Sequence, residues 1–186
     1  MEIPEGMGRF GIRRWCPEDA GALYAAAVES VAEVSRWLPW CHAGYTLAEA
    51  QAWVGTATEA WDSGNMYDFC IVERDTGWLV GGIGLSDVDR RQRMANLGYW
   101  VRTTYARRGA ATEAARLVAR FGFDQLGLLR IEIVVAIENL ASQRVAAKLG
   151  ALREGLLRNR ILVNGAPHHA FMHSLVPEDM ASWHRV

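Results

Sequence analysis

Residues 95 to 137 contain a strand, a helix and a second strand in direct succession. The runs at 95–102 and 130–137 are largely apolar, and the segment 109–126 between them has its apolar side chains at helical spacing. A helical crossover joins parallel strands, whereas the other strand candidates are joined by short polar turns that suit antiparallel neighbours. The sequence therefore predicts one parallel pair inside an otherwise antiparallel sheet.

The remaining elements complete a single predicted domain over residues 1–186. A helix over 46–63 is expected to begin at Thr46, with Glu49 as its capping-box partner. Asn164 and Gly165 predict a tight hairpin between the last two strands. Further helices are expected at 17–30 and 140–150, and further strands at 9–15, 66–73, 78–87, 155–163 and 168–176.

The composition is that of a globular protein. Of the 186 residues, 51% are hydrophobic and 22% are charged, and a chain of this length can bury a hydrophobic core without disulfides or a structural metal. Lysine and arginine number 20 against 21 acidic residues, so nucleic acid and anionic membranes are not expected partners. Cys16, Cys41 and Cys70 are unclustered and predict free thiols. No apolar leader or apolar span occurs, which favours a cytoplasmic protein.

The turn after strand 95–102 reads TTYARRGAATEA. Gly109, Ala110 and Ala111 carry almost no side chain, so an anion can approach the free N–H groups of the first helical turn. Arg107 and Arg108 add positive charge beside it. The alternative is an ordinary helix with two solvated arginines, since alanine favours helices in any context.

Two common nucleotide-binding motifs are absent from this turn. The pattern GxxxxGK[ST] does not occur, and a single glycine stands where GxGxxG needs three. Nucleotide hydrolysis and hydride transfer are therefore not expected. Lys148 is the only lysine, which leaves little scope for Schiff-base chemistry.

No metal site is predicted. His168, His169 and His173 fall in one strand, where alternation places the first on the opposite face from the other two, without carboxylate or cysteine partners nearby. The arginines within residues 90–93 are interpreted as a solvated hairpin tip.

Residues 97–158 resemble the GNAT superfamily of acyl-CoA N-acyltransferases, and within it the RimJ/RimL-type branch. The turn RRGAATEA, the segment ENLASQRV and the segment KLGALREG stand in the order and spacing of that family. SRWLPW at 35–40 and the late NG hairpin extend the resemblance over most of the chain. The family's turn, (Q/R/W)-x-x-G-x-(G/A), begins here with Ala106, and Arg107 stands where a glycine is frequent.

The resemblance implies an α+β fold with a mostly antiparallel, twisted sheet of about seven strands, splayed in the middle and flanked by helices on both faces. Acetyl-CoA, the cosubstrate, would lie in the splay, pair with the backbone of 100–102 and give its pyrophosphate to residues 107–112. The implied cofactor-binding residues are Trp100, Val101, Arg102, Arg107, Arg108, Gly109, Ala110, Ala111, Thr112, Asn139, Ser142 and Lys148.

The activity implied by the resemblance is transfer of an acetyl group to a primary amine, directly in a ternary complex and without metal. The N–H of Val101 would polarise the thioester carbonyl, and Asn139 and Ser142 would face the thiol, with Ser142 as proton donor. The alternative is that Asn139 and Ser142 only cap helix 140–150. A tyrosine donor is not assigned, because no tyrosine follows Tyr105.

The acceptor side is left open by the sequence. The amine proton is taken by water or by one of five side chains: Asp87, Glu132, Glu138, Glu154 and His42. Trp37 and Trp40 are expected to wall the acceptor pocket, and Trp53 and Trp61 to lie in the core. The acceptor is a protein N-terminal amine or a small amine, and family members often form homodimers. Two alternatives to the enzyme are a CoA-binding sensor without catalysis and a packing domain without ligand.

Overall fold

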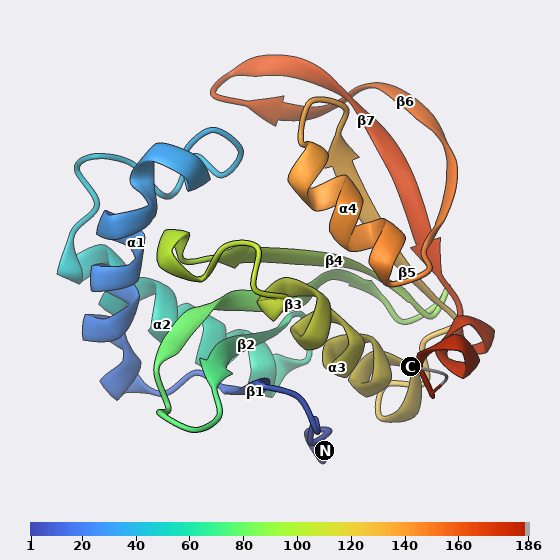
Figure 1. Cartoon of the computed structure of the whole chain (residues 1–186), viewed down its shortest axis with the longest axis horizontal. Helices are drawn as coiled ribbons and strands as arrows, with labels where there is room; N and C mark the ends of the chain where they lie inside the picture. Colours follow the sequence, from blue (N-terminus) through green and yellow to red (C-terminus); the bar gives the residue numbers. More distant parts are fainter. Residues whose placement is uncertain (185–186) are drawn as a thin grey trace.

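A mixed sheet of seven strands forms the centre of the protein, whose computed structural model describes residues 1–184 (Figure 1). The strands are β1 (Phe10–Arg14), β2 (Tyr67–Glu73), β3 (Leu79–Asp89), β4 (Met94–Val101), β5 (Arg130–Ala136), β6 (Leu152–Val163) and β7 (Ala166–Leu175). The helices are α1 (Ala20–Val34), α2 (Leu47–Ser63), α3 (Ala110–Asp124) and α4 (Leu140–Lys148). Short 3-10 turns are η1 (Pro17–Asp19), η2 (Thr103–Tyr105) and η3 (Pro177–His184).

The strand order is β1-β2-β3-β4-β5-β7-β6. Neighbouring strands are antiparallel except β4 and β5, which are parallel and connected through α3. The predicted α+β fold, with its single parallel crossover, is confirmed. The crossover matters because it places the end of β4 directly before the start of α3.

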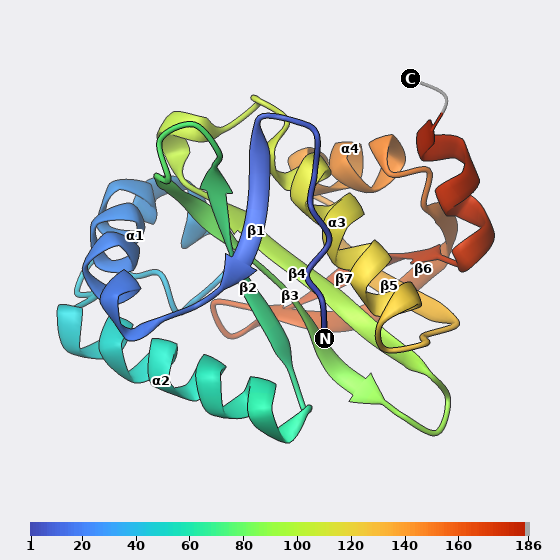
Figure 2. The ribbon, with the colours of Figure 1, turned by 90° about the horizontal axis from the view of Figure 1, so that it is seen from below.

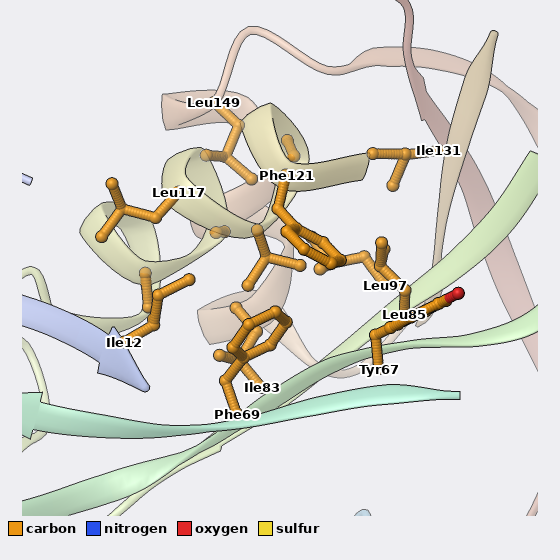
Figure 3. Close-up of a cluster of buried hydrophobic side chains, with 14 of the residues drawn as sticks. Ile12, Tyr67, Phe69, Ile83, Leu85, Leu97, Leu117, Phe121, Ile131 and Leu149 are labelled. Carbon is orange, nitrogen blue, oxygen red and sulfur yellow. The ribbon is translucent and has the colours of Figure 1, made fainter. Parts of the chain in front are cut away.

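Two apolar cores lie on opposite faces of strands β1 to β4. Helices α1 and α2 cover one face, and α3 covers the other (Figure 2). On the α3 side, Phe121 packs edge-on against Phe69 with 5.2 Å between ring centroids, and Leu85 and Leu97 lie beside them (Figure 3). In β4, strand alternation therefore sends odd-numbered residues such as Leu97 toward α3 and even-numbered ones such as Trp100 toward α1 and α2.

Two local predictions are confirmed in atomic detail. The Thr46 hydroxyl accepts the Glu49 N–H at 3.2 Å, and the Glu49 carboxylate accepts the Thr46 N–H at 2.9 Å, which completes the capping box of α2. Asn164 and Gly165 have φ values of 50° and 79°, the left-handed conformations that a tight hairpin requires.

Some element boundaries differ from the predicted ones. The first predicted helix begins as the η1 turn, where the Asp19 carboxylate accepts the Cys16 N–H at 2.9 Å and pairs with Arg13 at 2.6 Å, and α1 continues to Val34. Strands β6 and β7 start earlier than expected, at Leu152 and Ala166.

The three cysteines are free, as the sequence predicts. Among residues 1–184, none of the helices has both the length and the apolar character required to cross a bilayer.

Candidate active site

The sheet opens between β4 and β5. These strands pair only where Met94, Ala95 and Asn96 lie beside residues 130–132, and the rest of β4 pairs with β3 alone. Figure 1 shows β5 leading away from β4 together with β6 and β7. The backbone of residues 97–101 thus has one edge without a strand partner, which is where the predicted splay lies.

Backbone donors alternate in direction along this free edge. The Arg102 N–H donates to the Val80 carbonyl at 2.8 Å, so it is already used within the sheet. Because antiparallel pairing alternates at every second residue, Trp100 also points its backbone groups to β3, whereas Tyr99 and Val101 point theirs to the gap. Of the three backbone positions expected to pair with pantetheine, Val101 has the free groups.

The N-terminus of α3 has the features expected of an anion site. Gly109 caps the helix with φ 92°, a left-handed conformation that favours glycine, and no side chain caps the helix here. The first helical bond runs from the Glu113 N–H to the Gly109 carbonyl at 3.0 Å. The N–H groups of Ala110, Ala111 and Thr112 precede that bond and are directed along the helix axis, toward an incoming anion.

Charged side chains around this turn are arranged to leave it positive. Arg107 and Arg108 are exposed, and neither forms an ion pair within residues 1–184. Arg107 has φ 63°, a left-handed conformation that favours glycine. The Glu113 carboxylate accepts the Phe10 N–H at 2.9 Å, so it is tied to β1.

Ser142 and Asn139 lie at the start of α4, across the gap from β4. The Asn139 side chain accepts the Ser142 N–H at 3.1 Å, so Asn139 is the N-cap of α4, as the alternative interpretation held. The Ser142 hydroxyl lies 2.7 Å from the hydroxyl of Tyr99, a residue that sequence reasoning did not select. Burial raises the pKa of Tyr99 to about 12, which keeps the phenol protonated at neutral pH.

Two other predicted cofactor residues have structural partners. The Arg102 side chain pairs with Glu29 of α1, with 2.6 Å between Nε and Oε2. Lys148 lies exposed at the far end of α4, and its carbonyl accepts a hydrogen bond from Arg116 at 3.3 Å. Six residues separate it from Ser142, which corresponds to about 9 Å along a helix.

The five proposed proton acceptors are distributed over separate places. Glu132 and Glu154 both bind the Arg130 guanidinium, which holds the pKa of Glu154 at about 2 and makes it a poor base. Glu138 lies 3.4 Å from His168 on the surface. The other two are also exposed: Asp87 accepts from Ser86 at 3.2 Å, and His42 lies 3.1 Å from Glu49.

A cavity of about 380 Å³ lies on the face of the sheet that α1 and α2 cover. Its walls are largely aromatic and come from the α1–α2 loop, from α2 and from β4: Trp40, Tyr45, Trp53 and Trp100. Trp40 lines it as predicted, and Trp53 does so although it was assigned to the core. Trp37, which was expected to wall the pocket, does not line this cavity, and the guanidinium carbon of Arg36 lies 5.8 Å from its ring centroid.

Glycines make the floor of this cavity. Gly82 and Gly84 of β3 and Gly98 of β4 all line it, so no side chain extends from the sheet at these three positions. A Cβ on Gly82 would lie 2.6 Å from Nε1 of Trp100, so the indole lies directly over this glycine. The absence of side chains at these positions creates the cavity.

Asp68 of β2 is the one carboxylate that lines the cavity. Burial raises its pKa to about 7, so it changes protonation state near neutral pH. Sequence reasoning missed it, because the strand YDFCIVE shows only a polar residue among apolar ones. The glycines of β3 were the available signal.

A helix N-terminus beside an opened sheet, with a cavity on the opposite face, is the arrangement of an acyl-CoA-dependent N-acyltransferase. Residues 9–152 match the family model described as Acetyltransferase (GNAT) domain, and the chain belongs to this family of N-acetyltransferases.

Individual relatives agree with this assignment. The chain is 32% identical to the uncharacterized N-acetyltransferase YoaA of Bacillus subtilis (strain 168), over 90% of this chain and 93% of YoaA. Spermidine N(1)-acetyltransferase of Escherichia coli (strain K12) is 30% identical over 58% of this chain and 60% of its own length. The solved structure of Mycobacterium smegmatis RimJ in complex with CoA-disulfide has a TM-score of 0.85 and 26% identity, and covers 92% of this chain and 83% of RimJ.

Proposed function

We propose that this N-acetyltransferase moves the acetyl group directly from acetyl-CoA to a primary amine while both substrates are bound. The observation that carries this proposal is the position of residues 97–101 of β4. Their free edge follows the gap that leads to the start of α3, and Gly98 and Trp100 line the cavity on the opposite face. Acetyl-CoA would thus reach residues 97–101 along the free edge of β4, and the amine would reach them from the cavity on the face that α1 and α2 cover.

Residues on the two sides of the gap would polarise the thioester carbonyl and protonate the departing thiolate. The Val101 N–H would bind the thioester oxygen, a contribution of roughly 3 kcal/mol, or about a hundredfold in rate. The paired hydroxyls of Ser142 and Tyr99 would give a proton to the departing thiolate. The N–H groups of Gly109, Ala110, Ala111 and Thr112 would bind the pyrophosphate, with Arg107 and Arg108 beside it.

The acceptor we propose carries one amine at the reacting end. The cavity presents one carboxylate among aromatic walls, whereas a polyamine such as spermidine offers several positive charges that need several acidic partners. A small amine and an N-terminal residue both fit this description. We place the reaction in the cytoplasm, where three free cysteines remain reduced, and a homodimer remains an expectation from the family.

The test is release of free thiol from acetyl-CoA in the presence of primary amines, together with a thermal shift by acetyl-CoA alone. Turnover with at least one amine and a clear thermal shift are expected, since a ligand at about a hundred times its Kd adds roughly 2.7 kcal/mol. A thermal shift without turnover on any amine would favour a CoA-binding sensor. No thermal shift would contradict the proposal as a whole.

A further inference from the structure

Three residues form a straight row across the sheet beneath the cavity. In the pairing of β2 with β3, Asp68 lies opposite Gly84, and in the pairing of β3 with β4, Gly84 lies opposite Gly98. All three line the cavity. The row therefore leads from the carboxylate of β2 to the free edge of β4.

The Asp68 side chain lies over the middle of this row. A Cβ built on Gly84 would be 1.8 Å from Asp68 Oδ1, so the carboxylate occupies the space above the glycine. Neighbouring strands lie about 4.8 Å apart, which places the carboxylate about one strand spacing from Gly98. An acceptor amine that lies in the cavity on the β4 side of the carboxylate can give its proton to Asp68 directly or through one water.

Asp68 is the only charged group among the residues that line the cavity. The other titratable side chain there is Tyr45 from the α1–α2 loop, whose pKa burial raises to about 12, whereas the Tyr99 side chain points to the other face, toward Ser142. Further along the same face of β2, Cys70 faces the paired Arg13 and Asp19. Desolvation alone accounts for the altered pKa of Asp68.

The geometry points to Asp68 as the group that binds the acceptor amine and takes its proton, and to an acceptor whose amine is carried on an apolar or aromatic group. This inference rests on the proposed function and specifies the acceptor side of the same site. The carboxylate would bind the amine. Trp40, Trp53 and Trp100 would bury the apolar or aromatic part of the acceptor against the edges or faces of their rings.

The proton balance of this step is complete. The amine nitrogen forms the C–N bond, the C–S bond breaks, and one amine proton moves to the Asp68 carboxylate. The thiolate receives a proton from the hydroxyls of Ser142 and Tyr99, which recover it from solvent as Asp68 releases its own. The products are the N-acetyl amine and the free thiol of CoA, with no oxidant or metal consumed.

The experiment compares the wild-type enzyme with Asp68→Asn, which keeps the shape of the side chain but cannot accept the proton. With 2-phenylethylamine as acceptor, we expect kcat/KM to fall by about 100-fold or more, while the thermal shift by acetyl-CoA is unchanged. The wild-type rate should rise with pH through about 7, and this inflection should be absent in the variant. Asp75→Asn, on the exposed β2–β3 turn, is the matched control and should behave as wild type.

A second variant tests the placement without altering the carboxylate. Gly84→Ala puts a methyl group where Oδ1 lies, so the carboxylate must move, and kcat should fall although Asp68 is still present. Full activity and an unchanged pH profile in both variants would overturn the role of Asp68. If the wild type acetylates no amine at all, the proposed function fails instead.

The class of acceptor is tested on the wild type with three substrates. 2-Phenylethylamine and a peptide with an N-terminal phenylalanine both carry a primary amine on an aromatic group. The one with the higher kcat/KM shows whether the acceptor is a small amine or a protein N-terminus. Spermidine is the contrasting substrate, and we expect a kcat/KM at least about 10-fold lower. A preference for spermidine over both aromatic amines would contradict the apolar class.

Discussion

The start of α3 and the cavity under α1 and α2 offer a ligand different kinds of contact. The start of α3 offers backbone N–H groups made accessible by Gly109 and two alanines, so its geometry comes from one helix end. The cavity offers side chains from the α1–α2 loop, α2, β2 and β4 over a glycine floor. A backbone site suits a substrate part that never varies, and a side-chain site can be changed residue by residue to suit an acceptor.

The largest effect is expected at the backbone site. Gly109→Val places a β-branched residue at φ 92°, and the strain of about 2–3 kcal/mol should raise the Kd of acetyl-CoA by about 100-fold. Isothermal titration measures this change. Gly77→Val, at φ 70° in the β2–β3 turn, is the control for strain alone, and an equal loss of affinity there would refute a special role for Gly109.

A smaller effect is expected where β4 meets α4. Tyr99→Phe removes the hydroxyl that lies 2.7 Å from Ser142, and kcat should fall by about 30-fold because a hydrogen bond to a charged group is lost in the transition state. Steady-state kinetics should show little change in the Kd of acetyl-CoA. Tyr24→Phe, on the exposed side of α1, is the control, and a Tyr99→Phe enzyme with unchanged kcat would leave Ser142 as the sole hydroxyl in this role.

A substitution in the cavity wall should change only the KM for the acceptor. Trp40→Ala removes one aromatic wall and should raise the KM for 2-phenylethylamine by about 10-fold, through lost burial of roughly 1.5 kcal/mol. The Kd of acetyl-CoA should stay constant, which separates the two sites. Trp37→Ala, just outside the cavity, is the matched control; if both variants have the same KM, the cavity is not the acceptor site.

The smallest effect is a gain in stability. The pKa of Asp68 is about 7 in the folded protein and about 3.9 in an unfolded chain, so the folded state holds the proton more tightly. Stability is therefore lost as pH rises from about 4 to 7, and Asp68→Asn avoids this loss. At pH 8 its Tm should exceed the wild-type Tm by about 2–4 °C, and at pH 4 the difference should vanish. A lower Tm at pH 8 would show that the carboxylate stabilises the fold.

The order of helices and strands, the crossover and the start of α3 could be predicted from the sequence because each depends on residues close together in the chain. The small residues of RGAATEA, the capping box at Thr46 and the Asn164–Gly165 hairpin are such local signals. Asp68 could not be found in this way. Its role depends on two other strands. Their glycines indicate a stretch of sheet without side chains, but only the register shows that Asp68 lies in the same row.

Tyr99 was missed for a related reason. A tyrosine donor was sought only beyond Tyr105, whereas the opened sheet brings an earlier strand against the start of α4. Arg102 is a second example, because its backbone was expected to pair with the cosubstrate but its N–H donates to the Val80 carbonyl within the sheet. Partners from distant segments decide both cases.

The carboxylate that lies over Gly84 makes positions 68 and 84 dependent on each other during evolution. As long as an aspartate occupies position 68 in this orientation, any side chain at position 84 collides with it. A lineage that changes acceptor can replace the acid at position 68 first and the glycine at position 84 afterwards. In the reverse order, the new side chain at position 84 would clash with the acid. Among relatives, an acid at position 68 should therefore occur only with a glycine at position 84, whereas the glycine can remain after the acid is lost.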